Sequence, residues 1–207
     1  KKADEETKWK KKTDVLVIGY GGAGACAAIE AHDNGSKVLI IEKMAQPGGN
    51  TAISSGGFMV PQDGPTALKY LTATYDLANS EKDDELLNTF CKEIMGVKDW
   101  MTGLKEGTEL WVYGHAGFQN LPGWEVIDKY RVRGKKRSGD CLFDLYRYAV
   151  EEKRNIPVML ETPAVQLIQK DGQVVGAVAS NNGKNINIKV NKAVILTTGG
   201  YLISPGA

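Results

Sequence analysis

Three glycines near the start of the chain have the spacing that nucleotide-binding turns require. Gly19, Gly21 and Gly24 form the pattern G-x-G-x-x-G, and Glu42 follows Gly19 by 23 positions. The first glycine of such a pattern makes a tight turn, the second lets a pyrophosphate approach the backbone, and the third lets a helix pack closely on a strand. A carboxylate about 20 residues later accepts hydrogen bonds from ribose hydroxyls. This is the chemistry of adenine dinucleotide binding, and Glu42 would repel a 2′-phosphate.

The elements expected around these residues form a strand–helix–strand unit. The apolar run from Asp14 to Gly19 predicts a buried parallel strand, and the alanine-rich segment after it predicts a helix. The pair Asn34 and Gly35 predicts the end of that helix. Residues 37–42 predict a second buried strand with the acid at its end. In this context the start of the helix faces the phosphates with unpaired N–H groups.

A second glycine-rich stretch bears on which dinucleotide binds, because the first unit alone fits both NAD and FAD. The stretch GGNTAISSGG runs from Gly48 to Gly57, where a nicotinamide enzyme would normally continue into an ordinary helix. Its glycines, Asn, Thr and Ser supply donors for a second phosphate and for the edge of a flavin ring. The stretch therefore favours FAD, and the alternative is a flexible surface loop.

The rest of the chain divides into a helical middle and a strand-rich last third. Helical spacing predicts helices over 65–79, 83–104 and 140–154, and the glycine- and aromatic-rich segment 107–134 is expected to be an ordered loop. We therefore expect 60–138 to be a helical and loop insertion. Strands separated by the turn segments KDGQ and NNGK predict an antiparallel meander, followed by a buried strand in KAVILTTGG. The strands of the meander are predicted over 158–160, 165–169, 174–179 and 186–190.

Composition and charge exclude several classes of protein. Lys and Arg number 26 against 25 Asp and Glu, so no net field favours nucleic acid or an anionic membrane. No apolar run approaches the ~20 residues of a membrane span. The three cysteines are far apart and form no CxxC pair, so neither a disulfide framework nor a metal site is indicated. Residues 1–12 are expected to be a basic, solvated tail, and a soluble protein that is cytoplasmic or exported after loss of an upstream signal fits equally well.

Several segments together resemble the flavoprotein subunits of the fumarate reductase and succinate dehydrogenase superfamily. The resemblance is greatest to its soluble branch, which holds flavocytochrome fumarate reductases, urocanate reductases and FAD-dependent 3-ketosteroid dehydrogenases. The matching segments, in the family's order, are DVLVIGYGGAGACAAIEA, VLIIEK, GGNTAISSGG, TPAVQLI with DGQVVGAVA, and KAVILTTGGY. The resemblance implies an α/β fold, a Rossmann-like FAD-binding domain of the glutathione-reductase type with an antiparallel β-meander, over residues 13–207.

The resemblance also assigns expected contacts by position. The first glycine loop would meet the pyrophosphate, Glu42 with Lys43 the adenosine side, and the second glycine stretch the flavin. Residues 164–165 would contact the adenine, and 198–199 would close the same pocket. The candidate FAD-binding residues are Gly19, Gly21, Gly22, Ala23, Gly24, Glu42, Lys43, Gly48, Gly49, Asn50, Thr51, Gly56, Gly57, Ala164, Val165, Thr198 and Gly199.

Relative to this family, the sequence stops early. In these enzymes the chain continues after the strand that ends in TTGG into a capping domain and a final FAD segment, which supply most of the substrate clamp and the proton-transfer residues. We therefore expect a partial FAD-binding domain, with the catalytic residues unassigned.

The remaining candidates each allow two interpretations. His115 and Tyr113 are the titratable pair that could face a flavin, although a loop histidine bonded to backbone is the plainer interpretation. His32 is expected to be a favourable charge at a helix C-terminus. One basic cluster either attracts an anionic substrate or is a solvated loop; it comprises Lys129, Arg131, Arg133, Lys135, Lys136 and Arg137. One aromatic set either lines a flat substrate pocket or packs locally; it comprises Trp111, Tyr113, Phe118 and Trp124.

The expected function is an FAD enzyme that adds or removes hydrogen across a carbon–carbon double bond conjugated to a carbonyl. A small enoate or enone is the expected substrate, and its electron partner is not specified. Two alternatives remain: a flavoenzyme of the same fold that oxidises amines or amino acids, and a flavin module that passes electrons without catalysis.

Overall fold

The computed structural model describes residues 7–200. The chain forms two compact units, one made of Lys1–Ile53 with Phe143–Ala207 and the other of Ser54–Leu142. In the sequence, the second unit is therefore a single segment that interrupts the first. The glycine motif and the meander belong to the first unit, whereas the central helices and the aromatic segment belong to the second.

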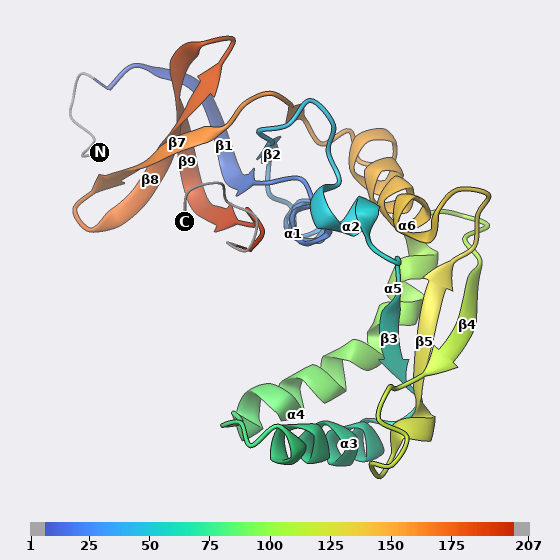
Figure 1. Ribbon diagram of the computed structural model, residues 1–207. Coiled ribbons are helices and arrows are strands. Elements are labelled where there is room, and N and C mark those ends of the chain that lie inside the picture. The colour runs from blue at the N-terminus through green and yellow to red at the C-terminus, as the bar shows by residue number, and fades with distance from the viewer. Residues whose placement is uncertain (1–6, 201–207) are drawn as a thin grey trace. The chain divides into compact units, whose positions relative to one another are not determined.

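A six-stranded sheet forms the centre of the first unit (Figure 1). Its strand order is β6-β2-β1-β9-β8-β7, in which neighbours from β6 to β9 are parallel and neighbours from β9 to β7 are antiparallel. The parallel part and the meander are thus one continuous sheet joined at β9. The strands are β1 Trp9–Ile18, β2 Val38–Ile41, β6 Val158–Met159, β7 Ala164–Lys170, β8 Gln173–Asn181 and β9 Lys184–Leu196.

The helix α1 (Gly22–Asp33) connects β1 to β2 and packs against both strands. Three of its four buried residues are small, Gly24, Ala25 and Ala28, which lets the helix lie close to the sheet, and the fourth is Ile29. The helix ends as predicted, because Gly35 has a φ of +79° and its N–H donates to the carbonyl of His32 at 2.8 Å. The strand–helix–strand unit predicted from the sequence is therefore confirmed.

Side chains from both parts of the sheet form one core. Successive residues of a strand point to opposite faces of the sheet. Every second apolar residue of β1 and β2 therefore lies on one face, where it packs with residues of β8 and β9. The buried residues of this cluster are Leu16, Ile18, Leu39, Ile41, Ala177, Ala179, Ile188 and Val190. The core therefore fixes the carboxyl ends of β1 and β2, where the first glycine loop and Glu42 begin.

The two hairpins of the meander have the turns that their sequences predict. Asp171 and Gly172 have φ values of +50° and +79°, and Asn182 and Gly183 have values of +50° and +71°. Two consecutive positive φ angles are typical of type I′ turns, which match the twist of the flanking strands. The predicted meander is confirmed for β7, β8 and the first half of β9.

Three predictions about the strands are wrong. Residues 9–12, expected in the basic tail, form the start of β1, where Trp9 is in register with Asn187 and its ring lies against Gly176. The two strands predicted at the end of the chain are one continuous strand, β9. The short strand β6 pairs with β2 in the parallel part of the sheet and does not belong to the meander.

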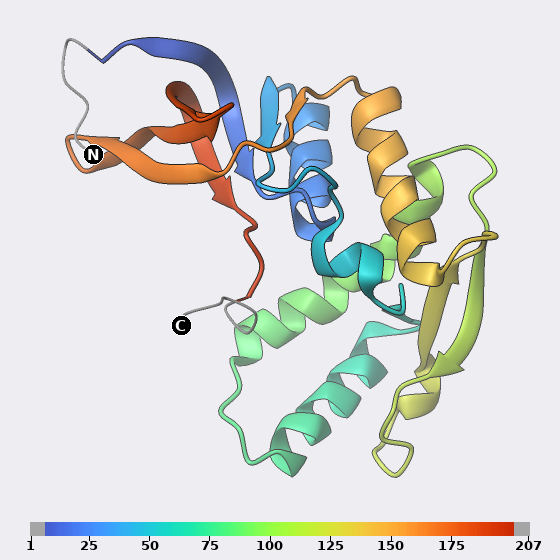
Figure 2. The same ribbon diagram turned by 45° about the horizontal axis from the view of Figure 1, so that its top comes forward.

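The second unit combines helices with a three-stranded antiparallel sheet (Figure 2). In the sheet β5 lies between β3 and β4, and α3 packs beside α4. Both helices begin at an aspartate whose carboxylate accepts a backbone N–H: Asp63 from Thr66 at 2.8 Å and Asp83 from Leu86 at 2.9 Å. The elements are β3 Phe58–Pro61, α3 Gly64–Leu77, α4 Asp84–Glu93, α5 Val97–Gly103, β4 Leu110–His115 and β5 Ile127–Val132.

The expected loop at 107–134 is wrong. It contains β4 and β5, which pair with each other, and β5 also pairs with β3. Glycine is rare in strands, and it interrupts the aromatic and β-branched residues that favour them in this segment. The strands are stable because their side chains pair across β3, β4 and β5. Trp111, Tyr113 and Tyr130 thus lie on the sheet, whereas Phe118 lies in the connection between β4 and β5 and Trp124 begins a 3-10 turn.

The remaining helices agree with the sequence. The predicted helix over 83–104 is present as α4 and α5, joined by a short 3-10 turn over Ile94–Gly96. The predicted helix over 140–154 is present as α6 (Ser138–Arg147), continued by a π-helical turn over Tyr148–Glu152. Among residues 7–200, no helix combines the length and the apolar character that crossing a bilayer requires.

Candidate FAD site

Two glycines of the first loop are required by the packing of the protein itself. Gly19 has a φ of +108°, and a Cβ there would overlap the backbone carbonyl oxygen of Thr197. A Cβ on Gly24 would overlap the carbonyl oxygen of Gly19 and would come within 2.8 Å of the Thr197 hydroxyl oxygen. These are the roles expected of the first and third glycines, a tight turn and close helix–strand packing.

Gly21 differs from both, because nothing in the protein excludes a side chain there. Its φ of −93° suits any residue, and a Cβ would meet only the carbonyl oxygen of Gly48 at an ordinary 3.6 Å. Gly21 is also the N-cap of α1 and has no side chain that could cap the first turn, and no acid lies in that turn. The Thr51 hydroxyl accepts the N–H of Gly22 at the start of the helix. A pyrophosphate fits here, since it would take up the space of a side chain at Gly21 and accept from the remaining N–H groups of the first turn.

The first part of the second glycine stretch, as far as Ile53, packs onto the first glycine loop within the same unit. The N–H of Gly48 donates to the carbonyl of Tyr20 at 2.8 Å, and Gly48 forms an isolated parallel bridge with Gly21. The hydroxyl of Thr51 accepts the N–H of Gly22 at 3.0 Å. The short helix α2 (Gly49–Ile53) therefore begins beside the start of α1, and its Gly49 and Asn50 are exposed.

Glu42 directly follows β2, with its carboxylate turned toward the first loop. One oxygen accepts the N–H of Tyr20 at 2.7 Å and the other accepts the N–H of Met44 at 2.9 Å. A carboxylate oxygen has two lone pairs, so each can still accept a ribose hydroxyl. The acid thus fixes the loop and retains the capacity for the role predicted from its spacing. Lys43 is exposed beside it.

The residues predicted at the start of β7 and after β9 adjoin Thr162 and Thr197, which are hydrogen-bonded to residues at the carboxyl ends of β2 and β1. Thr162 donates its N–H to the carbonyl of Glu42 at 2.8 Å, which brings the start of β7 close to that acid. Ala164 and Val165 follow and are exposed. After β9, Thr198 and Gly199 are also exposed. The sequence analysis missed their neighbour Thr197, whose hydroxyl bonds the carbonyl oxygens of Ile18 and Gly19, each at 3.0 Å.

Tyr20 occupies the x position between Gly19 and Gly21, and it is a second residue that the sequence analysis missed. Its ring is fully buried and packs edge-on against Phe143, and its hydroxyl donates to a carboxylate oxygen of Glu151 at 3.1 Å. Burial, reinforced by that carboxylate, raises the pKa of Tyr20 far above its usual range, so the phenol stays a donor. Tyr20 therefore links the loop to the turn after α6, a contact that motif spacing does not reveal.

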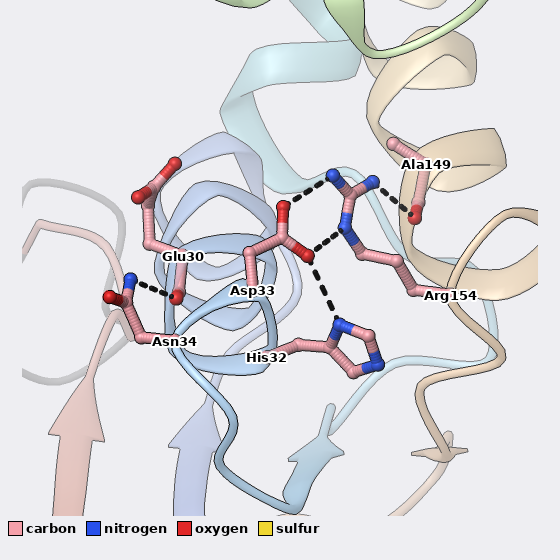
Figure 3. Close-up of polar contacts among 6 residues, drawn as sticks. All are labelled: Glu30, His32, Asp33, Asn34, Ala149 and Arg154. Atoms are coloured by element: carbon pink, nitrogen blue, oxygen red, sulfur yellow. Dashed lines mark hydrogen bonds and ion pairs between the residues drawn. The ribbon is translucent and has the colours of Figure 1, made fainter.

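The far end of α1 is tied down by a cluster of charges (Figure 3). Arg154 donates to both carboxylate oxygens of Asp33, at 2.6 and 2.7 Å, and to the carbonyl of Ala149 at 3.0 Å. This pairing lowers the pKa of Asp33 to about 2. His32 lies at the helix end as predicted, with its Nδ1 3.1 Å from the carboxylate of Asp33. The cluster holds the helix in place at the end opposite Gly21.

A cavity of about 580 Å³ opens beside this cluster, and not at the glycine loops. Its lining includes His32, Lys37 and Arg154 together with residues at the start of β2. In a Rossmann-like sheet, ligands bind at the carboxyl ends of the strands. This cavity is at the other end of β2, so it is no part of the candidate FAD site.

In the second unit, the two predicted glycines touch residues of its own sheet and of the start of α6. Gly56 has a φ of +66°, and a Cβ there would overlap the carbonyl of Ser138. A Cβ on Gly57 would overlap the hydroxyl of Tyr113. A substituent at either position would therefore displace its neighbour, which accounts for both glycines within the unit itself.

Several other candidates of the second unit have definite partners. The interpretation of His115 as a loop histidine bonded to backbone is wrong: it ends β4, with its Nδ1 3.1 Å from a carboxylate oxygen of Asp128 and its ring edge-on to Trp124. Phe118 is 52% exposed. Trp111 and Tyr113 lie together, 6.0 Å between ring centroids. In the basic cluster, Arg133 and Arg137 form ion pairs with Glu109 and Asp140.

Within residues 7–200, no group of three or more His, Cys, Asp or Glu side chains is arranged to hold a metal ion.

Comparison with known protein families decides the class of the chain. The model of the FAD binding domain family matches residues 14–203. The protein belongs to this family. FAD is accordingly its cofactor, and the choice of FAD over NAD that the second glycine stretch favoured is confirmed.

Curated relatives of this FAD binding domain include reductases of unsaturated acids. The chain is 32% identical to a fumarate reductase (cytochrome) from Shewanella frigidimarina over 198 residues, covering 91% of the chain and 33% of the relative. It is 32% identical to a urocanate reductase from Eggerthella lenta over 200 residues, covering 91% of the chain and 32% of the relative. The chain spans about a third of the length of these relatives.

A solved structure supports the fold in the same way. The open conformation of a flavocytochrome c3 fumarate reductase matches with a TM-score of 0.79 and 26% identity, covering 93% of the chain and 34% of that structure. The predicted resemblance to the fumarate reductase superfamily and the predicted α/β FAD-binding fold are therefore confirmed.

Proposed function

We propose that the full-length protein is an FAD-dependent oxidoreductase that adds or removes hydrogen across a carbon–carbon double bond conjugated to a carbonyl. One observation carries the proposal: relatives that match nine-tenths of the chain are a fumarate reductase and a urocanate reductase. The substrate class is a small enoate or enone.

The FAD domain supports this function by holding the cofactor. Bound FAD supplies hydride transfer at its flavin ring, and the protein supplies binding and orientation. The start of α1 at Gly21 holds the pyrophosphate, and Glu42 with Lys43 holds the adenosine side. Ala164 and Val165 contact the adenine. The other residues proposed to contact FAD are Gly19, Gly22, Ala23, Gly24, Gly48, Gly49, Asn50, Thr51, Gly56, Gly57, Thr198 and Gly199.

Glu42 illustrates how the fold prepares this binding. Its carboxylate already accepts two backbone N–H groups, which fixes its position before any ribose arrives. A preorganised acceptor loses little conformational entropy on binding. The hydrogen bonds it offers are charge-assisted and therefore stronger than neutral ones.

The test uses the full-length protein. The cofactor released by denaturation is identified by chromatography, and the holoenzyme is assayed with a reduced dye and a panel of enoates and enones. Recovery of FAD and turnover of at least one member of the panel are expected. FAD without turnover of any member would favour the electron-transfer module, and oxidation of amines or amino acids alone would favour the other alternative.

A further inference from the structure

The cavity beside the charge cluster at the end of α1 has the size of a small-molecule site. Its volume of about 580 Å³ lies within the roughly 300 to 1,000 Å³ that ligand pockets occupy. Four segments of the first unit form its walls: the start of β1, the end of α1 with the turn after it, the start of β2 and the segment before β6. The cavity is therefore built mainly on helix and strand ends that the sheet holds in place.

Among the described residues that line the cavity, every ionisable side chain is basic. Two carboxylates lie next to it, and both already have partners. Asp33 is paired with Arg154 (Figure 3), and Asp14 accepts N–H groups from Asn191 and from the backbone of Lys37. The charge of Asp14 also offsets part of the charge of Lys37. The ionisable lining residues are Lys11, Lys12, His32, Lys37 and Arg154.

Three of these cations are available to a ligand. Lys11, Lys12 and Lys37 are exposed, and none of them forms an ion pair within residues 7–200. A further lysine stands at the margin, because Lys192 donates to the hydroxyl oxygen of Ser36, another lining residue, at 3.0 Å. Like charges that share one cavity repel each other, and an anion between them is attracted by all of them. The lining therefore favours a ligand of high negative charge.

We propose that this cavity binds a phosphorylated small molecule, with the phosphate at the lysines and the organic part on an apolar wall. A phosphate monoester carries a charge of about −1.5 to −2 at neutral pH and three strong acceptor oxygens, and lysines bind phosphate as point charges. A carboxylate has a single charge and would use fewer of these cations. The apolar wall includes Val38 and Ile156, which are buried in the chain around the cavity.

The proposed site is separate from the candidate FAD site, and it does not depend on the proposed function. Lys37 precedes β2, whereas Glu42 follows it by five residues at the carboxyl end of the same strand. In an extended strand this is a rise of about 16 Å. Both ligands can therefore bind to one molecule, and loading the protein with FAD leaves the cavity accessible.

The test measures binding to the FAD-loaded full-length protein, in which bound FAD keeps nucleotides out of the cofactor site. AMP, glycerol 3-phosphate and inorganic phosphate are titrated by isothermal calorimetry, with adenosine and glycerol as uncharged counterparts. We expect at least one ester to bind roughly 10- to 100-fold more tightly than its counterpart, the range of a hydrogen bond to a charged group. Inorganic phosphate should bind more weakly than that ester, because it leaves the apolar wall uncovered.

The cavity variant is Lys11→Gln/Lys12→Gln/Lys37→Gln. All three side chains are exposed, so the variant should keep its FAD content and its unfolding midpoint in urea while the preference for the ester falls to near one. Each single variant should lose part of the preference. The single variants decide the question if the triple variant loses FAD or stability.

The matched control is Lys8→Gln/Lys10→Gln/Lys184→Gln. It removes the same number of charges from exposed lysines of the same sheet, none of which lines the cavity, so it should keep the preference. Three results would overturn the inference: no ester preferred over its counterpart in the wild type, a preference that survives in the cavity variants, or an equal loss in the control. Inorganic phosphate that binds as tightly as the esters would overturn the role given to the apolar wall.

Discussion

The glycine loop of the first unit and the sheet of the second each contain one residue that differs from a near neighbour in the contacts it makes within its own unit. In the loop, Gly19 and Gly24 are required by backbone contacts, whereas Gly21 has room for a side chain. In the sheet, Arg133 has a carboxylate partner, whereas Arg131 has none among the described residues. The comparison separates positions that a contact within the protein requires from nearby positions where no such contact is made.

The largest expected effect is the loss of folding stability in Gly24→Val. The new side chain would overlap the carbonyl of Gly19 and the side chain of Thr197, so α1 could not stay close to β1. Overpacking of this kind costs roughly 1 to 3 kcal/mol, and a backbone neighbour places it at the upper end. Urea unfolding of the apoprotein measures the change. A variant as stable as the wild type would mean that this contact is not made in solution.

Gly21→Val is the matched counterpart. We expect the apoprotein to unfold at nearly the wild-type urea concentration, because the new side chain meets no protein atom closely. FAD binding should weaken roughly 10- to 100-fold, since a side chain would take the place of a phosphate. Fluorescence titration with FAD measures this. Equal loss of stability in the two variants would remove the distinction between the two glycines.

Glu42→Ala should have a smaller effect on FAD binding. It removes a charge-assisted acceptor worth about 1.5 to 3 kcal/mol per hydrogen bond, part of which water replaces. Glu42→Gln is the control, because it keeps one acceptor oxygen and most of the shape, and its loss should be intermediate. The same FAD titration applies, and unchanged affinity in both variants would place the adenosine side elsewhere.

The smallest effect concerns Asp33 and Arg154. The pKa of Asp33 is lowered to about 2 in the folded chain. The contribution of the Asp33–Arg154 ion pair to the free energy of unfolding is therefore fully present above the pKa of about 3.9 that Asp33 has in the unfolded chain. This contribution is lost as the pH falls toward 2. Because Asp33 is 44% exposed, screening limits the contribution to about 1 kcal/mol. The difference in unfolding free energy between wild type and Asp33→Asn should shrink from pH 6 to pH 3, and a constant difference would contradict the pairing.

Local patterns predicted the parts of the fold that local physics determines. The apolar run after Asp14, the glycine that ends α1 and the turns at Gly172 and Gly183 act over a few residues, and all are confirmed. Strands that depend on distant partners were missed. β4 and β5 stabilise each other across the chain, and Trp9 belongs to a strand only because Asn187 lies beside it.

In the candidate site, too, features set by neighbouring residues were predicted and features set by distant partners were missed. Glycine spacing indicated the first loop and Glu42, because the chemistry of a nucleotide constrains short stretches of chain. Tyr20, Thr197 and the stacking of Arg131 on Tyr113 depend on contacts between segments far apart in sequence. No spacing rule records such contacts, although Tyr20 and Thr197 each adjoin a residue that the sequence analysis named, and Arg131 and Tyr113 are among its candidates.

The pairing of β1 with β9 has a consequence for synthesis on the ribosome. Ile18 is in register with Leu196, so the central strand of the parallel sheet acquires its second neighbour only after nearly all of the described chain has been made. At roughly 5 to 20 residues per second, translation of the intervening chain takes on the order of 10 to 35 s. During that interval one edge of an apolar strand has no neighbour, and an unpaired strand edge of this kind favours aggregation while the chain is still being made.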